Sequence, residues 1–334
     1  MKKLAVIILN WNGLPLLKQF IPAAARFTIS DEADLIVADN GSEDASLEWL
    51  EREFPQVRRI ALGKNYGFAE GYNRAIEACA GYPFTILLNS DVEVTEGWWQ
   101  PLLRFLETTP DAGACQPKIR SFRNRAYFEY AGAAGGMLDS LAYPYCRGRL
   151  FDKIEKDEGQ YDGETADIAW ASGAALALRT DLYLRIGGLD TRFFAHMEEI
   201  DLCCRIHAAG FRVCFVPEST VFHVGGASLA QGNPKKTYLN FRNNLLLIHK
   251  NTPRAIGRRR TIVRRLVDTA AFAMFLLKGD LANARAVVKA HSDFRRMAPL
   301  YTEFPGHDVL RALPGADRRI LIDRYLPFLS RRKK

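Results

Sequence analysis

The chain has 334 residues, 48% of them hydrophobic and 25% charged, which suits one large domain with an appendage or two modest domains. The composition argues against disorder. The six cysteines show no paired zinc spacing, and Cys203 and Cys204 are adjacent, which argues against a disulfide framework. We expect reduced thiols in a cytoplasmic protein.

The formal charge of +8 is distributed unevenly along the chain. Residues 1–250 carry 27 Lys and Arg against 31 Asp and Glu, whereas residues 251–334 carry 19 against 7. We therefore predict two parts, a mildly acidic catalytic domain over residues 1–250 and a basic helical extension over residues 251–334 that seeks an anionic surface.

The amino-terminal segment MKKLAVIILNWNG combines two lysines with an apolar run, as a signal peptide does. The run is short, however, and no small-residue cleavage site follows it. We interpret residues 4–9 as the first buried strand.

Short apolar runs then alternate with amphipathic stretches. We expect strands at residues 33–38, 57–62 and 84–88, and helices at 16–27, 42–54 and 68–80. This alternation is typical of βαβ units, so we predict a Rossmann-like α/β fold with a mostly parallel central sheet and flanking helices.

Each predicted strand ends in polar residues. Because the carboxyl ends of parallel strands meet at one edge, where open α/β folds bind ligands, we expect these residues to lie side by side. The polar residues are Asn10, Asp39, Asn40, Gly41, Asn65, Asn89, Ser90 and Asp91.

The segment from 120 to 170 mixes aromatic residues and arginines irregularly, and we interpret it as an excursion that covers the ligand crevice. From Trp170 the periodic pattern returns. It predicts a helix in SGAALALR, then a loop, a helix in HMEEIDLCCR and a strand in FRVCFVP that ends at Pro217.

Beyond Lys250 a cluster of arginines precedes LVDTAAFAMFLL, whose apolar residues fall at helical spacing. The apolar section is far shorter than the roughly 20 residues of a spanning helix, and Asp268 interrupts it. Two interpretations stay open. The segment is a basic amphipathic helix in the membrane interface, or a helix that packs its apolar face on the domain. Charge alone permits nucleic-acid binding, but the interleaved apolar residues favour lipid, so we expect no nucleic-acid partner.

Several of these residues have side chains suited to phosphate chemistry. Asp91 at a strand exit can hold a divalent cation that neutralises a phosphate leaving group, although Asp is also common in turns. Asp39 can accept hydrogen bonds from a base or ribose, or can belong to a plain Asn-Gly turn. The glycines around Asn65, including Gly67, allow close approach to an anion, but they match neither a Walker loop nor a dinucleotide motif.

A second group of acids, Glu198, Glu199 and Asp201, begins a predicted helix. The helix dipole alone favours acids there, yet three in four residues can also place a general base in a crevice. His223, followed by two glycines, is either a structural histidine or a metal ligand.

The ordered set VIILNWNG, VADNGSEDAS, NYGFAEGYNRAI, LLNSDVEV, SGAALALR, GGLDTRFFAHMEEIDLCCR and FHVGGAS resembles family 2 glycosyltransferases of the GT-A fold. The resemblance is to the rhamnosyltransferase-like branch, which builds bacterial surface polysaccharides. It covers about residues 1–250 and gives no information about the basic extension.

The resemblance implies a site for a nucleotide-sugar donor, with Asp39 at the base. It also implies that Asp91 ends a DxD-type motif for Mg or Mn, supported by His223. The family's catalytic base is an Asp, and Glu199 stands at that position, with Glu198 or Asp201 as alternatives. The remaining residues are implied as donor contacts (Asn10, Asn65, Gly67, Asn89 and Ser90) and as the sugar and acceptor side (Trp170, Ser172 and Gly173).

The implied activity is inverting transfer of a sugar from a nucleoside diphosphate, such as dTDP-rhamnose or a UDP-sugar, to a lipid-linked or polysaccharide acceptor. The implied location is the cytoplasmic side of the plasma membrane, where the enzyme is peripheral. Because Glu replaces Asp at the base position, a catalytically silent homologue that binds nucleotide sugars or glycans is the alternative. A nucleotidyltransferase is a third class, but its glycine-rich, lysine-bearing opening is absent from residues 4–17.

Overall fold

The computed structural model describes residues 2–163, 165–225 and 232–325. The chain divides into two compact units. Unit 1 comprises Met1–Gly136, Cys146–Phe194 and Glu198–Gly225, and unit 2 comprises Met137–Tyr145, Ala195–Met197 and Gly226–Lys334. From the sequence we predicted a domain boundary at residue 250. The division into a catalytic domain and a basic extension at that residue stays a prediction.

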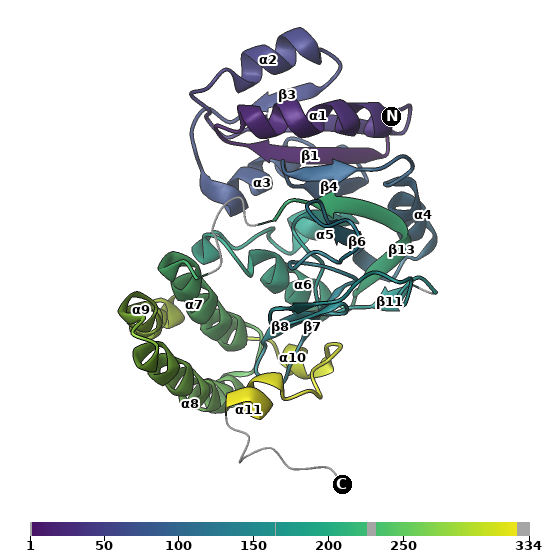
Figure 1. Ribbon diagram of the computed structural model, residues 1–334. Helices are drawn as coiled ribbons and strands as arrows, with labels where there is room; N and C mark the ends of the chain where they lie inside the picture. Colours follow the sequence, from purple (N-terminus) through teal and green to yellow (C-terminus); the bar gives the residue numbers. More distant parts are fainter. Residues whose placement is uncertain (1, 164, 226–231, 326–334) are drawn as a thin grey trace. The chain divides into compact units, whose positions relative to one another are not determined.

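The first half of unit 1 is a run of parallel strands joined by helices, as predicted (Figure 1). The elements are β1 (Leu4–Asn10), α1 (Leu14–Thr28), β2 (Ala33–Asp39), α2 (Ser46–Glu53), β3 (Arg58–Ala61), α3 (Gly67–Glu77) and β4 (Phe84–Leu88). The apolar side chains of β1, β2 and β4 are almost wholly buried, which explains why these strands appear as continuous apolar runs, whereas the edge strand β3 is partly exposed.

The second half of unit 1 extends the same sheet beyond β4. The full strand order is β11-β13-β6-β12-β4-β1-β2-β3, with β5 paired to β13. Among these, β12 runs antiparallel to both β4 and β6, whereas β6 and β13 are parallel. The added elements are β5 (Val92–Val94), α4 (Gln100–Thr108), β6 (Ala112–Ser121), β11 (Ala166–Asp167), β12 (Ala175–Arg179), α5 (Thr180–Arg185), η1 (Thr191–Phe193), α6 (Glu198–Ala208) and β13 (Arg212–His223).

The helix predicted in SGAALALR is wrong, because Ala175–Arg179 form the central strand β12 and the helix α5 starts only at Thr180. Alanine and leucine favour helices, but hydrogen bonding to β4 on one side and β6 on the other overrides that local preference. The strand begins opposite the end of β4, where Ala175 pairs with Leu88.

The prediction that a strand ends at Pro217 is also wrong, because β13 continues from Arg212 to His223. Its pairing with β6 shifts register between Val216 and Thr220, and this irregularity accommodates a proline that lacks a ladder N–H. The longer strand carries His223 to its last position.

The segment from 120 to 170 contains several very short strands, which explains its irregular pattern. A small four-stranded sheet has the order β10-β9-β8-β7. Its strands are β7 (Gly136–Leu138), β8 (Pro144–Cys146), β9 (Arg149–Leu150) and β10 (Lys153–Ile154).

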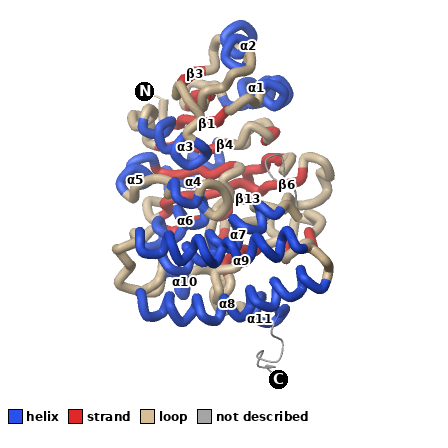
Figure 2. The backbone as a smooth tube through the Cα atoms, turned by 90° about the vertical axis from the view of Figure 1, so that its left-hand side faces the viewer, coloured by secondary structure: helices blue, strands red, loops and turns tan. Residues whose placement is uncertain are grey.

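Unit 2 is mainly helical, and α7, α8 and α9 pack against one another within it (Figure 2). The long helix α8 confirms the helix predicted after Lys250. No described helix meets the length and hydropathy needed to cross a membrane. The helices are α7 (Pro234–Lys250), α8 (Arg254–Leu277), α9 (Leu281–Met297), η2 (Ala298–Leu300), α10 (Val309–Ala312) and α11 (Ile320–Tyr325).

Candidate active site

The exits of β1 and β2 are joined by a buried polar network. Asn10 and Asp39 are paired in the strand register, and Asn10 Nδ2 donates to Asp39 Oδ1 over 3.0 Å. Ser42 donates its backbone N–H to Asp39 Oδ2 over 2.9 Å and its hydroxyl to Asp39 Oδ1 over 2.6 Å. The Asp39 carboxylate, only 2% exposed, thus fixes the turn after β2, and its Oδ2 accepts only one of these hydrogen bonds.

The loop before α3 is held against this turn by Asn40. Its Nδ2 donates to the Gly67 carbonyl over 3.0 Å and to Asn65 Oδ1 over 3.2 Å, and its Oδ1 accepts from Tyr66 N–H over 3.0 Å. Gly41 has φ +75°, and a Cβ there would lie 2.5 Å from Lys64 Cα. Asn65 is exposed, and these contacts hold its loop beside the exit of β2.

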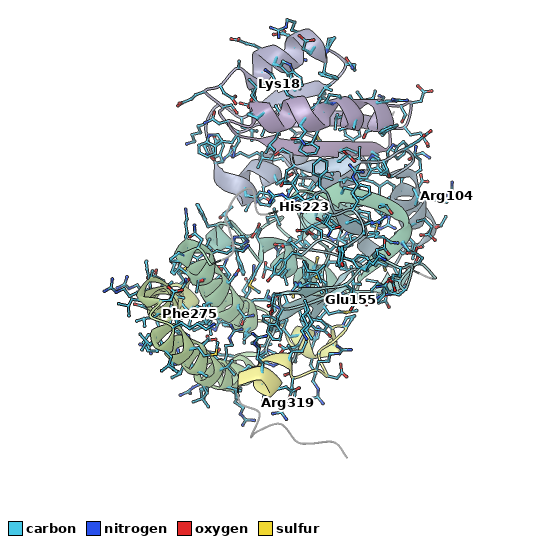
Figure 3. The ribbon with its side chains drawn as sticks, in the orientation of Figure 1. Lys18, Arg104, Glu155, His223, Phe275 and Arg319 are labelled. Carbon is cyan, nitrogen blue, oxygen red and sulfur yellow. The ribbon has the colours of Figure 1, made fainter. Side chains whose placement is uncertain are left out.

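The exit of β4 brings Asp91 to the end of β13. Asp91 Oδ1 lies 3.1 Å from Nε2 of His223, which Figure 3 marks at the end of that strand. The other imidazole nitrogen, Nδ1, lies 3.4 Å from Glu129 Oε2, an ion-pair distance without the alignment of a hydrogen bond. All three side chains are buried, so the imidazole is enclosed by two carboxylates.

This arrangement shifts two pKa values in opposite directions. Burial alone would lower the pKa of His223, but the carboxylates of Asp91 and Glu129 outweigh it and raise that pKa to about 10. Burial would raise the pKa of Asp91, but the His223 hydrogen bond and charge lower it. The Asp91 carboxylate is therefore held ionised.

The Asp91 carboxylate fits a divalent cation. The imidazole of His223 is protonated between two carboxylates, so it becomes a ligand only when an arriving cation displaces a proton. Carboxylate oxygen and imidazole nitrogen are both accepted by Mn²⁺, and Asp91 also suits Mg²⁺. Among the described residues, no cluster of three or more His, Cys, Asp or Glu side chains forms a complete metal site. A cation held here would need further oxygen ligands from a bound molecule such as a diphosphate.

The acids at the start of α6 lie beside the entry to β12. An ideal Cβ on Gly173 would lie 3.8 Å from the Cβ of Glu199 and 3.8 Å from the ring of Phe68. Because Asn89 N–H donates to the Ala174 carbonyl over 3.0 Å, the entry to β12 adjoins the exit of β4. Glu199 is thus brought to the same edge of the sheet as Asn89.

Glu198 differs from its neighbour in burial. It is 6% exposed, and its Oε2 has no hydrogen-bond partner among the described residues. Burial and the adjacent charge of Glu199 raise the pKa of Glu198 well above its usual range. Glu198 is therefore held as a neutral acid next to Glu199.

Asp201 is engaged in a structural ion pair. It is fully buried, and its Oδ2 accepts from Arg205 Nε over 2.9 Å. The same guanidinium donates to the carbonyls of Ile186 and Gly188, over 2.8 and 2.6 Å. Asp201 therefore anchors α6 to the loop that precedes it.

The side chains of Trp170 and Ser172 are buried behind this edge of the sheet. Both are 3% exposed, and Trp170 packs its ring against Gly136, where a Cβ would lie 2.2 Å from the indole. Ser172 N–H donates to Gln116 Oε1 over 2.9 Å, and its hydroxyl donates to the Ala131 carbonyl. Of the three residues predicted for the acceptor side, Gly173 is the partly exposed one.

All of these residues lie in unit 1. The prediction that strand exits converge is supported by a continuous series of contacts from Asp39 through Asn10, the paired strands β1 and β4, and Asn89 to Gly173 and Glu199. Asn89, Ser90 and Asp91 form the exit of β4 itself. The end of the predicted motif FHVGGAS, from Gly226, lies outside the described residues.

Sequence reasoning missed Glu129 and Ser42. Ser42 has a recognisable signal, since a serine three residues after a strand-terminal Asp commonly closes a polar turn. Glu129 lies in the aperiodic segment, and nothing in its local sequence links it to His223. Its carboxylate is fixed by the N–H of Ala131, and Gly225 lies so close that a Cβ there would be 2.5 Å from Glu129 Oε1.

Comparison with solved structures defines the class of fold. The S. aureus TarS fragment 1–349 in complex with UDP-GlcNAc superimposes with a TM-score of 0.58 at 15% identity, covering 89% of this chain and 81% of that one. Mannosyltransferase PcManGT from Pyrobaculum calidifontis, with GDP-Man and Mn²⁺, gives 0.52 at 15% identity over 91% and 77%. The chain has the GT-A fold, as the resemblance predicted.

The sequence comparisons give the family. The model of glycosyl transferase family 2 matches residues 5–170. The N-acetylglucosaminyl-diphospho-decaprenol L-rhamnosyltransferase of Mycobacterium tuberculosis H37Rv is 27% identical over 233 residues, 66% of this chain and 75% of that protein. Rhamnosyltransferase WbbL of Escherichia coli K12 is 24% identical over 201 residues, 58% and 74%. The chain belongs to glycosyltransferase family 2, and the predicted rhamnosyltransferase-like resemblance is confirmed.

Proposed function

We propose that the protein is a metal-dependent, inverting glycosyltransferase that moves a sugar from a nucleoside diphosphate to a hydroxyl group of a lipid-linked or polysaccharide acceptor. The observation that carries the proposal is the placement of an ionised Asp91, paired with His223, at the same sheet edge as the acids of α6. Leaving-group stabilisation and proton removal need these two kinds of group close together.

The relatives support the substrate class. The mycobacterial relative is named for L-rhamnosyl transfer to a diphospho-decaprenol lipid, and the E. coli relative is named as a rhamnosyltransferase. Solved neighbours hold UDP-GlcNAc or GDP-Man, so the fold accommodates different bases and sugars. We infer a nucleotide-sugar donor, such as dTDP-rhamnose or a UDP-sugar, and a role in cell-surface glycan synthesis.

On the donor side, Asp39 and Asn65 lie at the exits where a base and ribose would bind, with Asn10, Gly67, Asn89 and Ser90 completing the edge. Asp91 and His223 would hold a Mg²⁺ or Mn²⁺ ion, and Glu129 would orient the imidazole from its other side. When bound, such an ion neutralises charge on a departing diphosphate. The ionised state of Asp91 suits it to a cation.

On the acceptor side, Glu199 is the proposed general base. Its Cβ and Cγ lie 3.8 and 3.9 Å from the point that a Cβ on Gly173 would occupy, so the glycine adds no side chain beside Glu199. The pKa of the neighbouring Glu198 is raised by burial and by the charge of Glu199, so Glu198 is the poorer candidate for accepting the proton of the acceptor hydroxyl. Asp201 is bound to Arg205 and is proposed to position α6 rather than to accept a proton.

The catalytic step would be a single displacement. Glu199 takes the proton of the acceptor hydroxyl, the freed oxygen bonds to the anomeric carbon, and the bond to the diphosphate breaks with its electron pair on the leaving oxygen. No protein nucleophile is needed. The alternative of a silent binding homologue is not favoured, because the named relatives are transferases.

We further propose that the enzyme works as a peripheral protein at the cytoplasmic face of the plasma membrane, where a lipid-linked acceptor would be accessible. The support is chemical, since an acceptor with a long isoprenoid chain stays in the bilayer while the donor is water-soluble. The basic extension over residues 251–334 offers charges for anionic lipid.

A donor screen tests the proposal. Purified protein is incubated with Mn²⁺ and a panel of nucleotide sugars, and both slow donor hydrolysis and thermal stabilisation are measured. We expect one donor class to raise the Tm only when Mn²⁺ is present, and Asp91→Asn to abolish that rise. Stabilisation by a nucleoside triphosphate with diphosphate release, and by no nucleotide sugar, would instead identify a nucleotidyltransferase.

A further inference from the structure

The helical hairpin of α8 and α9 in unit 2 exposes an unusual number of apolar side chains. Among the described residues, nine of the fifteen exposed large hydrophobic residues lie in this region, and Leu277 at the turn is 89% exposed. The nine are Ile256, Ile262, Leu266, Met274, Leu276, Leu277, Leu281, Val288 and Leu300. Such a concentration marks an interaction surface.

The middle of α8 turns one charged pair inward. Arg264 and Asp268 are buried and form an ion pair of 2.6 Å, and His291 of α9 lies 3.0 Å from the second oxygen of Asp268. Arg264 also donates to Asn244 of α7. Polar contacts thus hold the middle of α8 to its neighbours, in addition to its buried apolar side chains.

The outward side of α8 is correspondingly apolar. Ile262 and Leu266 are 52% and 56% exposed, and together with Leu277 they fall on one side of the helix at 3.6 residues per turn. Exposed Arg258 and Arg259 flank this side. The sequence analysis predicted a single apolar face, but the structure divides it, since Val267 and Ala271 are buried.

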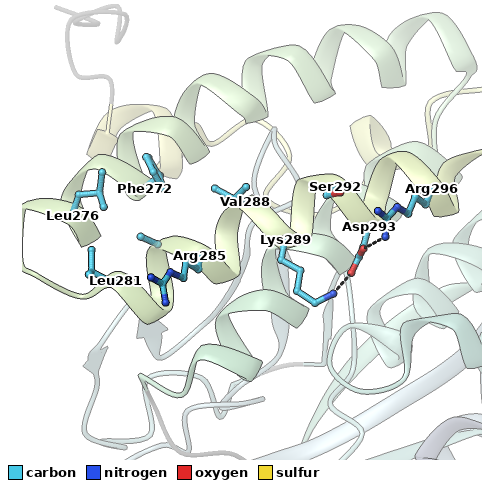
Figure 4. Close-up of a pocket in the computed structure, with 10 residues that line it drawn as sticks. Phe272, Leu276, Leu281, Arg285, Val288, Lys289, Ser292, Asp293 and Arg296 are labelled. Carbon is cyan, nitrogen blue, oxygen red and sulfur yellow. Dashed lines mark hydrogen bonds and ion pairs between the residues drawn. The ribbon is translucent and has the colours of Figure 1, made fainter.

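A groove of about 550 Å³ continues this surface between the carboxyl end of α8 and the exposed side of α9. Figure 4 shows Phe272, Leu276 and Leu281 gathered at the turn, with Lys289 and Arg296 towards the other end. The groove is therefore apolar at the turn and polar beyond it.

The polar half of the groove has cationic charge in excess. Lys289 and Arg296 share one carboxylate, Asp293, at 2.6 and 3.5 Å, and Arg285 has no ion-pair partner among the described residues. Over residues 254–297 the sequence has eleven Lys and Arg against three Asp and no Glu. An anionic partner with an apolar interior matches both halves of the surface.

We propose that this hairpin docks the protein on an anionic lipid bilayer. The turn residues Leu276, Leu277 and Leu281 enter the interface, and Arg285 with the neighbouring cations binds lipid phosphates. In this proposal the hairpin lies in the plane of the interface. The biological purpose of this docking rests on the proposed function. Its test does not, because lipid binding can be measured without sugar transfer.

Vesicle sedimentation of the full chain tests the inference. We expect binding to vesicles of phosphatidylglycerol and phosphatidylcholine, weak binding to phosphatidylcholine alone, and loss of binding as salt is raised, because exposed charges are screened. Leu277→Ser with Leu281→Ser is expected to weaken binding about tenfold or more, since two leucines no longer leave water. Arg285→Gln with Arg258→Gln is expected to weaken binding and flatten its salt dependence.

Matched controls come from unit 1. Leu184, an exposed leucine, and Arg104, an exposed arginine marked in Figure 3, are changed to Ser and Gln, and both variants should bind vesicles like the parent. Unchanged Tm values show that the hairpin variants fold. Equal binding by hairpin and control variants, or equal binding to neutral and anionic vesicles, would overturn the inference.

Two further outcomes separate this inference from others. A dimer that dissociates in the Leu277→Ser, Leu281→Ser variant, without vesicle binding by the parent, would assign the surface to a second copy of the chain. Vesicle binding without turnover of any donor would leave the docking surface standing and overturn the proposed function, whereas turnover on a water-soluble acceptor without vesicle binding would do the reverse.

Discussion

Two groups of buried carboxylates in unit 1 use the same residue types to opposite effect. At the exit of β4, Asp91 and Glu129 face a shared imidazole, so negative charge is balanced by His223 and the pKa of Asp91 is lowered. At the start of α6, Glu198 and Glu199 are adjacent, and burial with mutual repulsion raises the pKa of Glu198. One environment stabilises a carboxylate, and the other stabilises a carboxylic acid.

The two groups of acids therefore suit different chemistry. A carboxylate kept ionised attracts a cation, whereas a pair of acids with separated protonation states suits proton transfer. Neither property follows from residue type or burial alone, because Asp91 and Glu198 are both acids and both almost fully buried. Single substitutions in the two groups can test this division between cation binding and proton transfer.

The largest effect is expected for Asp91→Asn. The change keeps the side-chain volume but removes the ionised oxygen, so we expect kcat/KM to fall by about 10⁴-fold and Mn²⁺-dependent nucleotide binding to be lost. Calorimetric titration of UDP with and without Mn²⁺ measures it. Asp34→Asn is the matched control, since Asp34 bonds Lys2 and Tyr82 at the opposite end of β2. An Asp91→Asn enzyme with unchanged metal dependence would refute the assignment.

Glu199→Gln is expected to lower kcat by about 10³-fold while donor binding persists, because only proton removal is lost. The adjacent Glu198→Gln, already neutral in the native protein, should retain kcat within about tenfold. Single-turnover rates with equal donor affinity check the pair. If Glu198→Gln is the inactive variant, the roles of the two acids are reversed.

Asp201→Asn provides a second contrast on α6. We expect it to lower the free energy of unfolding by about 3 kcal/mol, because a buried partner of Arg205 loses its charge. The folded fraction should keep its kcat. A variant of normal stability that transfers no sugar would make Asp201 the base.

Glu129→Gln tests whether the second carboxylate beside His223 orients the imidazole. The amide can still accept from Ala131 N–H, but it loses the charge that faces Nδ1, so we expect Mn²⁺ affinity to fall by about 10- to 100-fold. Electron paramagnetic resonance of Mn²⁺ with UDP present reports binding without any turnover. An unchanged Mn²⁺ affinity would show that Glu129 serves folding alone.

The smallest effect concerns the pH dependence of stability. Because the pKa of Glu198 is raised in the folded state, folded protein binds more protons than unfolded protein above the usual glutamate range, and stability falls as pH rises. Glu198→Gln removes this contribution. We expect its Tm to exceed that of the parent by a few degrees at pH 8 and by less at pH 5; a constant difference would contradict the raised pKa.

The sequence sufficed for features that depend on continuous local patterns. The buried strands β1, β2 and β4 appear as apolar runs, and their shared direction predicts that Asn10, Asp39 and Asn89 meet at one edge. It failed for β12, because a segment rich in alanine and leucine becomes a strand only through its neighbours. Glu129 was hidden for a related reason, since its partner His223 lies 94 positions later in the chain. Contacts between residues far apart in the chain do not alter the local spacing of apolar residues, so periodicity does not reveal them.

The antiparallel direction of β12 has a consequence for how this protein tolerates change. Since β12 starts where β4 stops, the site is built from the exits of four strands, β1, β2, β4 and β13, and the entry of a fifth, β12. Adding or deleting one residue in the turn between Trp170 and Ala175 would displace Gly173 from Glu199 and put the side chain of a neighbouring residue in its place. At this short turn the number of residues therefore matters as much as their identity.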